Sequence, residues 1–140
     1  PDDAIISNDA MPSGEDIQQF VTQTQVDCIS PAVGNIHGML KNSTNPNLNI
    51  KLLQGIANTV DTPIVLHGGS GIHDKDFVAA IKAGVSMIHV NTELRRAWRQ
   101  GIEQVLSDYP DEVAPYKLLK LSKQNVTRVV TQKLRLFHRL

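Results

Sequence analysis

Three histidines stand where apolar segments give way to polar residues: His37 in GNIHG, His67 in LHGGSG and His89 in HVNTE. His37 and His67 are each followed directly by glycine. A neutral imidazole is a good zinc ligand, and catalytic zinc commonly takes three protein ligands and keeps one position for substrate. A glycine beside the ligand leaves room for a substrate to approach. The pattern favours a metal site, and hydrogen-bonded loop histidines are the alternative.

The segment Gly68-Gly69-Ser70, which follows His67, could hold an anion. Successive backbone N–H groups in such a turn can form an anion-binding nest, to which the Ser70 hydroxyl adds a donor. A predicted helix starts close by, and its N-terminus would favour the same charge. An ordinary glycine turn between a strand and a helix is the alternative interpretation.

These groups must be positioned by the elements around them, and the apolar patterns predict an alternating order of helices and strands. Strands are expected over 26–33, 62–67 and 85–90, and a long loop over 34–49. Helices are expected over 13–24, 50–60, 74–84 and 93–110, the last ended by Pro110, with an amphipathic helical tail over 116–140. The order predicts an α/β fold with a parallel sheet, in which polar residues at the carboxyl ends of strands gather at one site. Three strands with exposed edges would be unusual alone, so we expect part of something larger.

Several local expectations follow from single residues. Ser13 and Asp74 are predicted N-caps, and Gly84 is a predicted helix terminator. Cys28, within an expected buried strand, is predicted to be a small core residue.

A second set concerns side-chain direction. Strand alternation predicts that Met87, His89 and Asn91 share one face. Trp98 and the arginines near it could bind a phosphate or a partner, but such a run is more often one face of a helix.

Bulk composition excludes several classes of function. The 140 residues are 41% hydrophobic and 20% charged, with fourteen basic and fourteen acidic residues. The balance gives no reason to expect nucleic acid or a membrane surface as a partner. The single cysteine permits no internal disulfide, no apolar run reaches transmembrane length, and no signal peptide is recognisable. We expect a cytoplasmic protein, and the absence of an initiator Met suggests processing or a fragment.

The segments AVGNIHG, PIVLHGGSGI and VNTELR, in this order and spacing, resemble the C-terminal half of class II ketose-bisphosphate aldolases. The resemblance covers nearly the whole chain. It implies that residues 1–140 are the C-terminal portion of a zinc-dependent (β/α)8 TIM barrel, with about three βα units and the 116–140 tail. The implied assembly is a homodimer or higher oligomer.

The resemblance also implies roles for individual residues. His37 and His67 look like two of three zinc ligands, and Gly38 like the glycine beside dihydroxyacetone phosphate and a monovalent cation, Na⁺ or K⁺. The remaining implied contacts are to the substrate or its phosphate, and they comprise Gly68, Gly69, Ser70, His89, Asn91 and Thr92.

Three departures from the family pattern stand out. The family's first zinc histidine and catalytic aspartate would lie upstream, so no catalytic acid is expected in this half. Met87 and His89 replace a lysine and a substrate-contacting asparagine; His89 could be a replacement donor, an extra metal ligand, or the mark of altered or lost activity. Gln25 stands where the family generally has glycine, which would cost strain if the turn still needs a positive φ.

The expected function is therefore zinc-dependent, reversible aldol cleavage of a ketose 1,6-bisphosphate, fructose or tagatose, to dihydroxyacetone phosphate and glyceraldehyde 3-phosphate. The resemblance implies this for the full-length barrel, and the 140 residues alone are expected to be inactive. One alternative is a non-catalytic relative that binds sugar phosphate or a partner. Another is an unrelated phosphate-binding barrel that lacks zinc.

Overall fold

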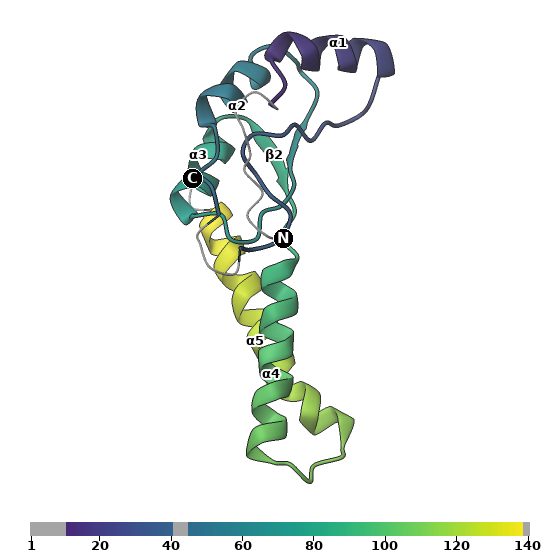
Figure 1. Ribbon diagram of the computed structural model, residues 1–140, viewed down its shortest axis with the longest axis vertical. Helices are drawn as coiled ribbons and strands as arrows, with labels where there is room; N and C mark the ends of the chain where they lie inside the picture. Colours follow the sequence, from purple (N-terminus) through teal and green to yellow (C-terminus); the bar gives the residue numbers. More distant parts are fainter. Residues whose placement is uncertain (1–10, 41–44, 139–140) are drawn as a thin grey trace. The chain divides into compact units, whose positions relative to one another are not determined.

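The computed structural model describes residues 11–40 and 45–138. Residues 41–44 of the expected long loop and 139–140 of the expected tail lie outside this part. The chain divides into two compact units, and the boundary falls between Val90 and Asn91 (Figure 1). The two expected strands 62–67 and 85–90 belong to the first unit, and the two C-terminal helices form the second.

The sheet of the first unit is parallel, as the alternation of elements predicted. Strand β1 (Ile64–Leu66) pairs with β2 (Val85–Ile88), with an irregularity in register between Ile64 and Val65. All three β1 residues are buried, which is typical of a strand inside a parallel sheet.

The strand expected over 26–33 is reduced to one parallel bridge between Ile29 and Ile64, so that prediction was too long. Ile29 donates its N–H to the Pro63 carbonyl and accepts from Val65. Pro31 has no N–H to continue the ladder. Cys28, next to the bridge, is exposed, which corrects its expected place in the core.

Helix α1 (Gly14–Thr24) begins with a capping box between Ser13 and Asp16. The Asp16 backbone donates to Ser13 Oγ at 3.1 Å, and the Ser13 backbone donates to Asp16 Oδ2 at 2.8 Å. The hydrogen bonds from the Ser13 hydroxyl and backbone lower the pKa of the Asp16 carboxyl. The helix ends at Gln25, whose φ of 52° and ψ of 39° are left-handed. The positive φ anticipated from the resemblance is therefore present on a residue with a Cβ.

Helices α2 (Ile50–Ala57) and α3 (Asp74–Lys82) complete the first unit. Asn49 caps α2 by accepting from the Leu52 N–H. Asp74 is the first helical residue rather than the N-cap; His73 takes the cap position without a side-chain hydrogen bond. The helices and strands share a core of buried apolar side chains, which includes Ile17, Val33, Leu48, Leu53, Ile56, Leu66, Phe77, Ala80 and Val85.

The second unit is a hairpin of α4 (Thr92–Asp108) and α5 (Pro115–Phe137), which lie side by side in Figure 1. Helix α4 ends two residues before Pro110, and α5 begins close to its predicted start. The helices approach closely because Gly101 has no side chain: a Cβ there would lie 2.5 Å from the Ser122 Cα. Within the described residues, no helix is both long and apolar enough to span a bilayer.

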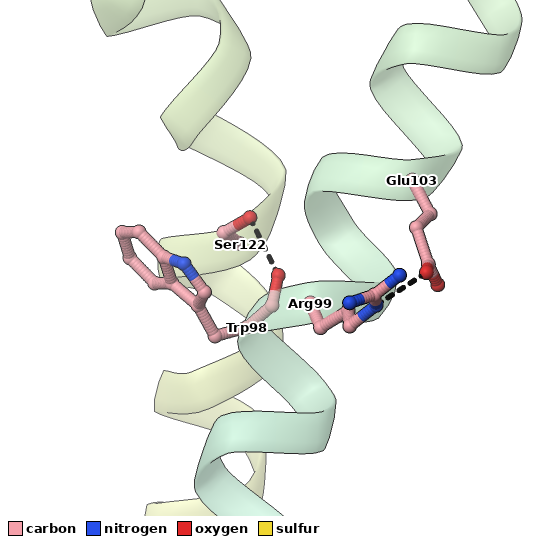
Figure 2. Close-up of polar contacts among 4 residues, drawn as sticks. All are labelled: Trp98, Arg99, Glu103 and Ser122. Carbon is pink, nitrogen blue, oxygen red and sulfur yellow. Dashed lines mark hydrogen bonds and ion pairs between the residues drawn. The ribbon is translucent and has the colours of Figure 1, made fainter.

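Hydrogen bonds join α4 to α5 near this close approach. Ser122 Oγ donates to the Trp98 carbonyl at 2.9 Å (Figure 2). Arg99 pairs with Glu103 one turn along α4, on an exposed surface. The arginine run near Trp98 therefore lies on a helix, as the simpler interpretation predicted, and it includes an i,i+4 ion pair.

Candidate functional site

The His67 backbone is fixed by the strand that ends at Leu66 and by a side chain from the preceding loop. Asn35 Nδ2 donates to the His67 carbonyl at 3.0 Å, and Asn35 Oδ1 accepts from the Val33 N–H at 2.9 Å. One amide thus ties the end of the first apolar segment to the end of β1. His67 itself is half-buried, so its ring can still meet a ligand.

His37 is brought to His67 by a close backbone approach. Gly68 has a φ of +65°, and a Cβ on it would collide with the Ile36 carbonyl oxygen. Only glycine therefore fits at this point. The His37 and His67 rings lie with centroids 5.9 Å apart and planes inclined by 36°. The structure brings together the two histidines that the sequence singled out.

Gly38, which follows the exposed His37, has a φ of +98°. A Cβ built on it meets no atom within 4 Å. The positive φ favours glycine at this position, and among the described residues the space beside it is open.

A buried amide, Asn45, joins the loop of His37 to the turn after His67. Its Nδ2 donates to the Gly38 carbonyl at 3.0 Å and to the Ser70 carbonyl at 2.9 Å. Its Oδ1 accepts from the Leu40 N–H at 3.1 Å. Because Asn45 is only 6% exposed, water does not compete strongly for these bonds. The two loops are held as one structure.

The glycine-serine turn packs closely against the backbone of His89. The Gly69 N–H donates to the His89 carbonyl at 2.9 Å, so it is already engaged within the protein. A Cβ on Gly69 would lie 2.7 Å from the same carbonyl oxygen. Ser70 is 2% exposed. Any phosphate at this turn would rely on donors other than the Gly69 N–H.

His89, the residue after β2, faces His67. Its Nδ1 lies 3.4 Å from His67 Nδ1, and the rings meet edge to face with centroids 4.4 Å apart. Its Nε2 lies 3.3 Å from Met87 Sδ, so Met87 and His89 share a face as strand alternation predicted. Asn91 and Thr92 belong to the second unit, where they begin α4.

The donor set fits part of a zinc site. The exposed His37 ring and the half-buried His67 ring lie close together, and imidazole nitrogen is a common ligand of zinc. Among the residues that the structure describes, no group of three or more histidine, cysteine, aspartate or glutamate side chains has the arrangement of a metal site. A complete site would therefore need a ligand from outside this part of the chain.

The sequence argument missed the two asparagines, Asn35 and Asn45. Neither was among the expected site residues, yet Asn35 hydrogen-bonds the His67 carbonyl and Asn45 hydrogen-bonds the Gly38 and Ser70 carbonyls. A recognisable feature was the abundance of asparagine in the 34–49 loop, because buried loop backbone needs side-chain partners.

The first unit is a parallel α/β structure in which His67 and His89 follow the two strands and His37 lies in a neighbouring loop. A family model for fructose-bisphosphate aldolase class-II matches residues 2–139. The chain belongs to this family, which confirms the resemblance found in the sequence.

Curated relatives agree. A probable fructose-bisphosphate aldolase of Bacillus subtilis (strain 168) is 34% identical over 136 residues, and a fructose-bisphosphate aldolase of Staphylococcus epidermidis is 33% identical over the same length. The match covers 97% of this chain and 47% of each relative. The chain thus spans about half the length of the curated relatives it matches.

Solved structures confirm the fold class. The YdjI aldolase from Escherichia coli K12 superposes with a TM-score of 0.79 at 29% identity, covering 91% of this chain and 46% of that one. A fructose-bisphosphate aldolase from Campylobacter jejuni gives a TM-score of 0.73 at 18% identity, covering 92% and 46%, and shows the fold alone. The chain is a partial TIM barrel.

Proposed function

We propose that this chain forms half of the active site of a zinc-dependent ketose-bisphosphate aldolase. The reaction is the reversible cleavage of fructose or tagatose 1,6-bisphosphate to dihydroxyacetone phosphate and glyceraldehyde 3-phosphate. The observation that supports it most directly is the His37–His67 pair, with ring centroids 5.9 Å apart and a glycine beside each ring. Family membership makes an aldol reaction the leading expectation.

Each residue would have a distinct task. His37 and His67 would hold zinc together with a ligand from outside the described residues. Bound zinc would supply a Lewis acid for the substrate carbonyl oxygen, a contribution of several kcal/mol in metal-assisted reactions. Gly38 would leave space for the ketose and lie beside a monovalent cation.

The rest of the substrate would be held by polar groups. Gly68, Gly69 and Ser70 would form the turn beside the phosphate, with a donor other than the Gly69 N–H holding it. Asn91 and Thr92, at the start of α4, would contact the sugar phosphate. As a cytoplasmic enzyme of this family, the whole protein would act as a homodimer or higher homo-oligomer.

The proposal is tested by removing one ligand. We expect His67→Ala to lose bound zinc, measured as metal content per chain after dialysis against a weak chelator, and to lose aldol cleavage with it. His73→Ala, which removes an exposed histidine outside the site, is the matched control and should keep its zinc. One zinc per chain in both variants would show that the ligand assignment is wrong.

A second candidate function is binding of sugar phosphate without turnover. It is favoured by His89 and Met87, which replace the asparagine and lysine implied by the resemblance. Calorimetric binding of dihydroxyacetone phosphate by a full-length, zinc-loaded protein that cleaves neither bisphosphate would support this function over catalysis.

A further inference from the structure

An ion pair that is largely shielded from water joins α5 to the start of α4. Lys133 Nζ lies 3.1 Å from Glu93 Oε2, and the two side chains are only 16% and 20% exposed. The Arg99–Glu103 pair, by contrast, lies within one helix, and its side chains are 78% and 55% exposed. Water and salt screen a shielded pair less, so the loss of one partner leaves a charge that solvent does not fully compensate.

Glu93 lies in the first turn of α4, directly after the two residues proposed to contact the sugar phosphate. Asn91 is the N-cap and is exposed, and Thr92 is the first helical residue. The Arg95 N–H donates to the Asn91 carbonyl at 3.1 Å, which closes this turn. The N-terminus of a helix favours an anion, whereas an unpaired carboxylate in the same turn would repel one. The charge of Glu93 therefore bears on any phosphate bound at Asn91 and Thr92.

We propose that Lys133 neutralises the charge of Glu93 and thereby keeps the start of α4 able to bind an anionic sugar phosphate. The inference rests on the proposed function, in which Asn91 and Thr92 contact that ligand, and it adds a residue of α5 to the set. Lys133 is a positioning residue, because it acts through Glu93. An unpaired carboxylate at Glu93 would repel the phosphate equally before and during the reaction, so the effect falls on KM and not on kcat.

The test measures KM and kcat for cleavage of fructose or tagatose 1,6-bisphosphate by the zinc-loaded, full-length protein. We expect Lys133→Met to raise KM about five- to tenfold and to leave kcat within about twofold of the parent. Lys133→Arg keeps the charge and should keep the parent KM. Lys123→Met, the same change at an exposed position of α5, is the matched control and should alter neither constant.

Two further variants separate the charge effect from a loss of packing. Glu93→Gln combined with Lys133→Met removes both charges, so KM should return to within about twofold of the parent. Glu93→Gln alone leaves Lys133 as an unpaired cation, so KM should not rise, and this variant carries the test where Lys133→Met fails to fold. A double variant as impaired as Lys133→Met, or a raised KM in Glu93→Gln, would overturn the inference, because Lys133 would then only support the helix pair.

Failure of this inference is distinguishable from failure of the proposed function. If the parent cleaves bisphosphate and Lys133→Met keeps its KM, or loses only kcat, the aldolase proposal stands and the role of Lys133 fails. If the parent binds dihydroxyacetone phosphate without cleaving either bisphosphate, calorimetry should show the same five- to tenfold weakening in Lys133→Met, and unchanged affinity would overturn the inference. A parent that neither cleaves nor binds would contradict both proposals.

Discussion

At the residue scale, Asn45 joins the two loops of the candidate site. Its three hydrogen bonds reach Gly38, Leu40 and Ser70. We expect Asn45→Ala to lower the free energy of unfolding by about 1–3 kcal/mol, because it leaves buried backbone groups without partners. Urea denaturation measures the change.

Asn47, an exposed residue of the same loop, provides the control. Asn47→Ala should change the free energy of unfolding by no more than about 0.5 kcal/mol. Equal losses in the two variants would show that the hydrogen bonds of Asn45 add little stability.

Residues with a distinctive side-chain chemistry were the ones that could be identified from the sequence. Metal binding suits few residue types, so the sequence singled out His37 and His67 with the glycines that follow them. The structure places the two rings close together. Asn45 was missed because its role depends on loops that meet only in the folded chain. Cys28 was misplaced because a strand pattern was assumed where only one bridge forms.

At the element scale, α1 ends at a residue whose backbone conformation favours glycine. The backbone of Gln25 is left-handed, with a φ of 52°. A non-glycine residue in this conformation costs roughly 1 kcal/mol. We expect Gln25→Gly to raise the free energy of unfolding by up to about 1 kcal/mol, measured by thermal or urea denaturation.

Gln19→Gly is the same chemical change at an exposed position inside α1. There the backbone is helical, so glycine should lower the free energy of unfolding by about 0.5–1 kcal/mol. If both variants were destabilised, the left-handed turn would carry no strain that glycine relieves.

The limits of the helices were predicted well because caps, terminating residues and apolar spacing all lie within the helix segment itself. The Ser13 cap, Gly84 and the apolar spacing of the tail gave the elements nearly their observed limits. Strands were predicted too long, because strand length is decided by partners. The apolar run 26–33 supplies the pattern of a strand, but only Ile29 pairs with β1.

At the scale of the whole molecule, the chain covers about half the length of its relatives. The match spans 47% of the curated relatives and 46% of the YdjI aldolase. We therefore expect the protein isolated from its native source to have an intact mass near twice 15.4 kDa, with zinc-dependent aldolase activity. Intact-mass spectrometry measures this, and recombinant 140-residue chain provides the mass standard. A native mass equal to that standard would contradict the expectation and favour a binding role or a site completed by a second chain.

The architecture could be inferred from sequence because strand and helix alternate and because the polar strand ends recur in order. The substrate could not, since fructose and tagatose bisphosphates differ at one stereocentre and no residue of this chain decides between them. Only part of the metal site could be predicted from this sequence. His37 and His67 are present in it, whereas the aspartate and the third histidine that the resemblance implies are expected upstream.

The residue after Asn45 makes this asparagine resistant to deamidation. Asparagine usually deamidates when the backbone nitrogen of the following residue loses its hydrogen and attacks the side-chain amide, which forms a cyclic imide. Pro46 has no hydrogen on that nitrogen, so this route to aspartate is closed at position 45. A carboxylate here would set its oxygens against the carbonyls of Gly38 and Ser70. The amide that joins the two loops is thus protected from the commonest spontaneous damage to its side-chain type.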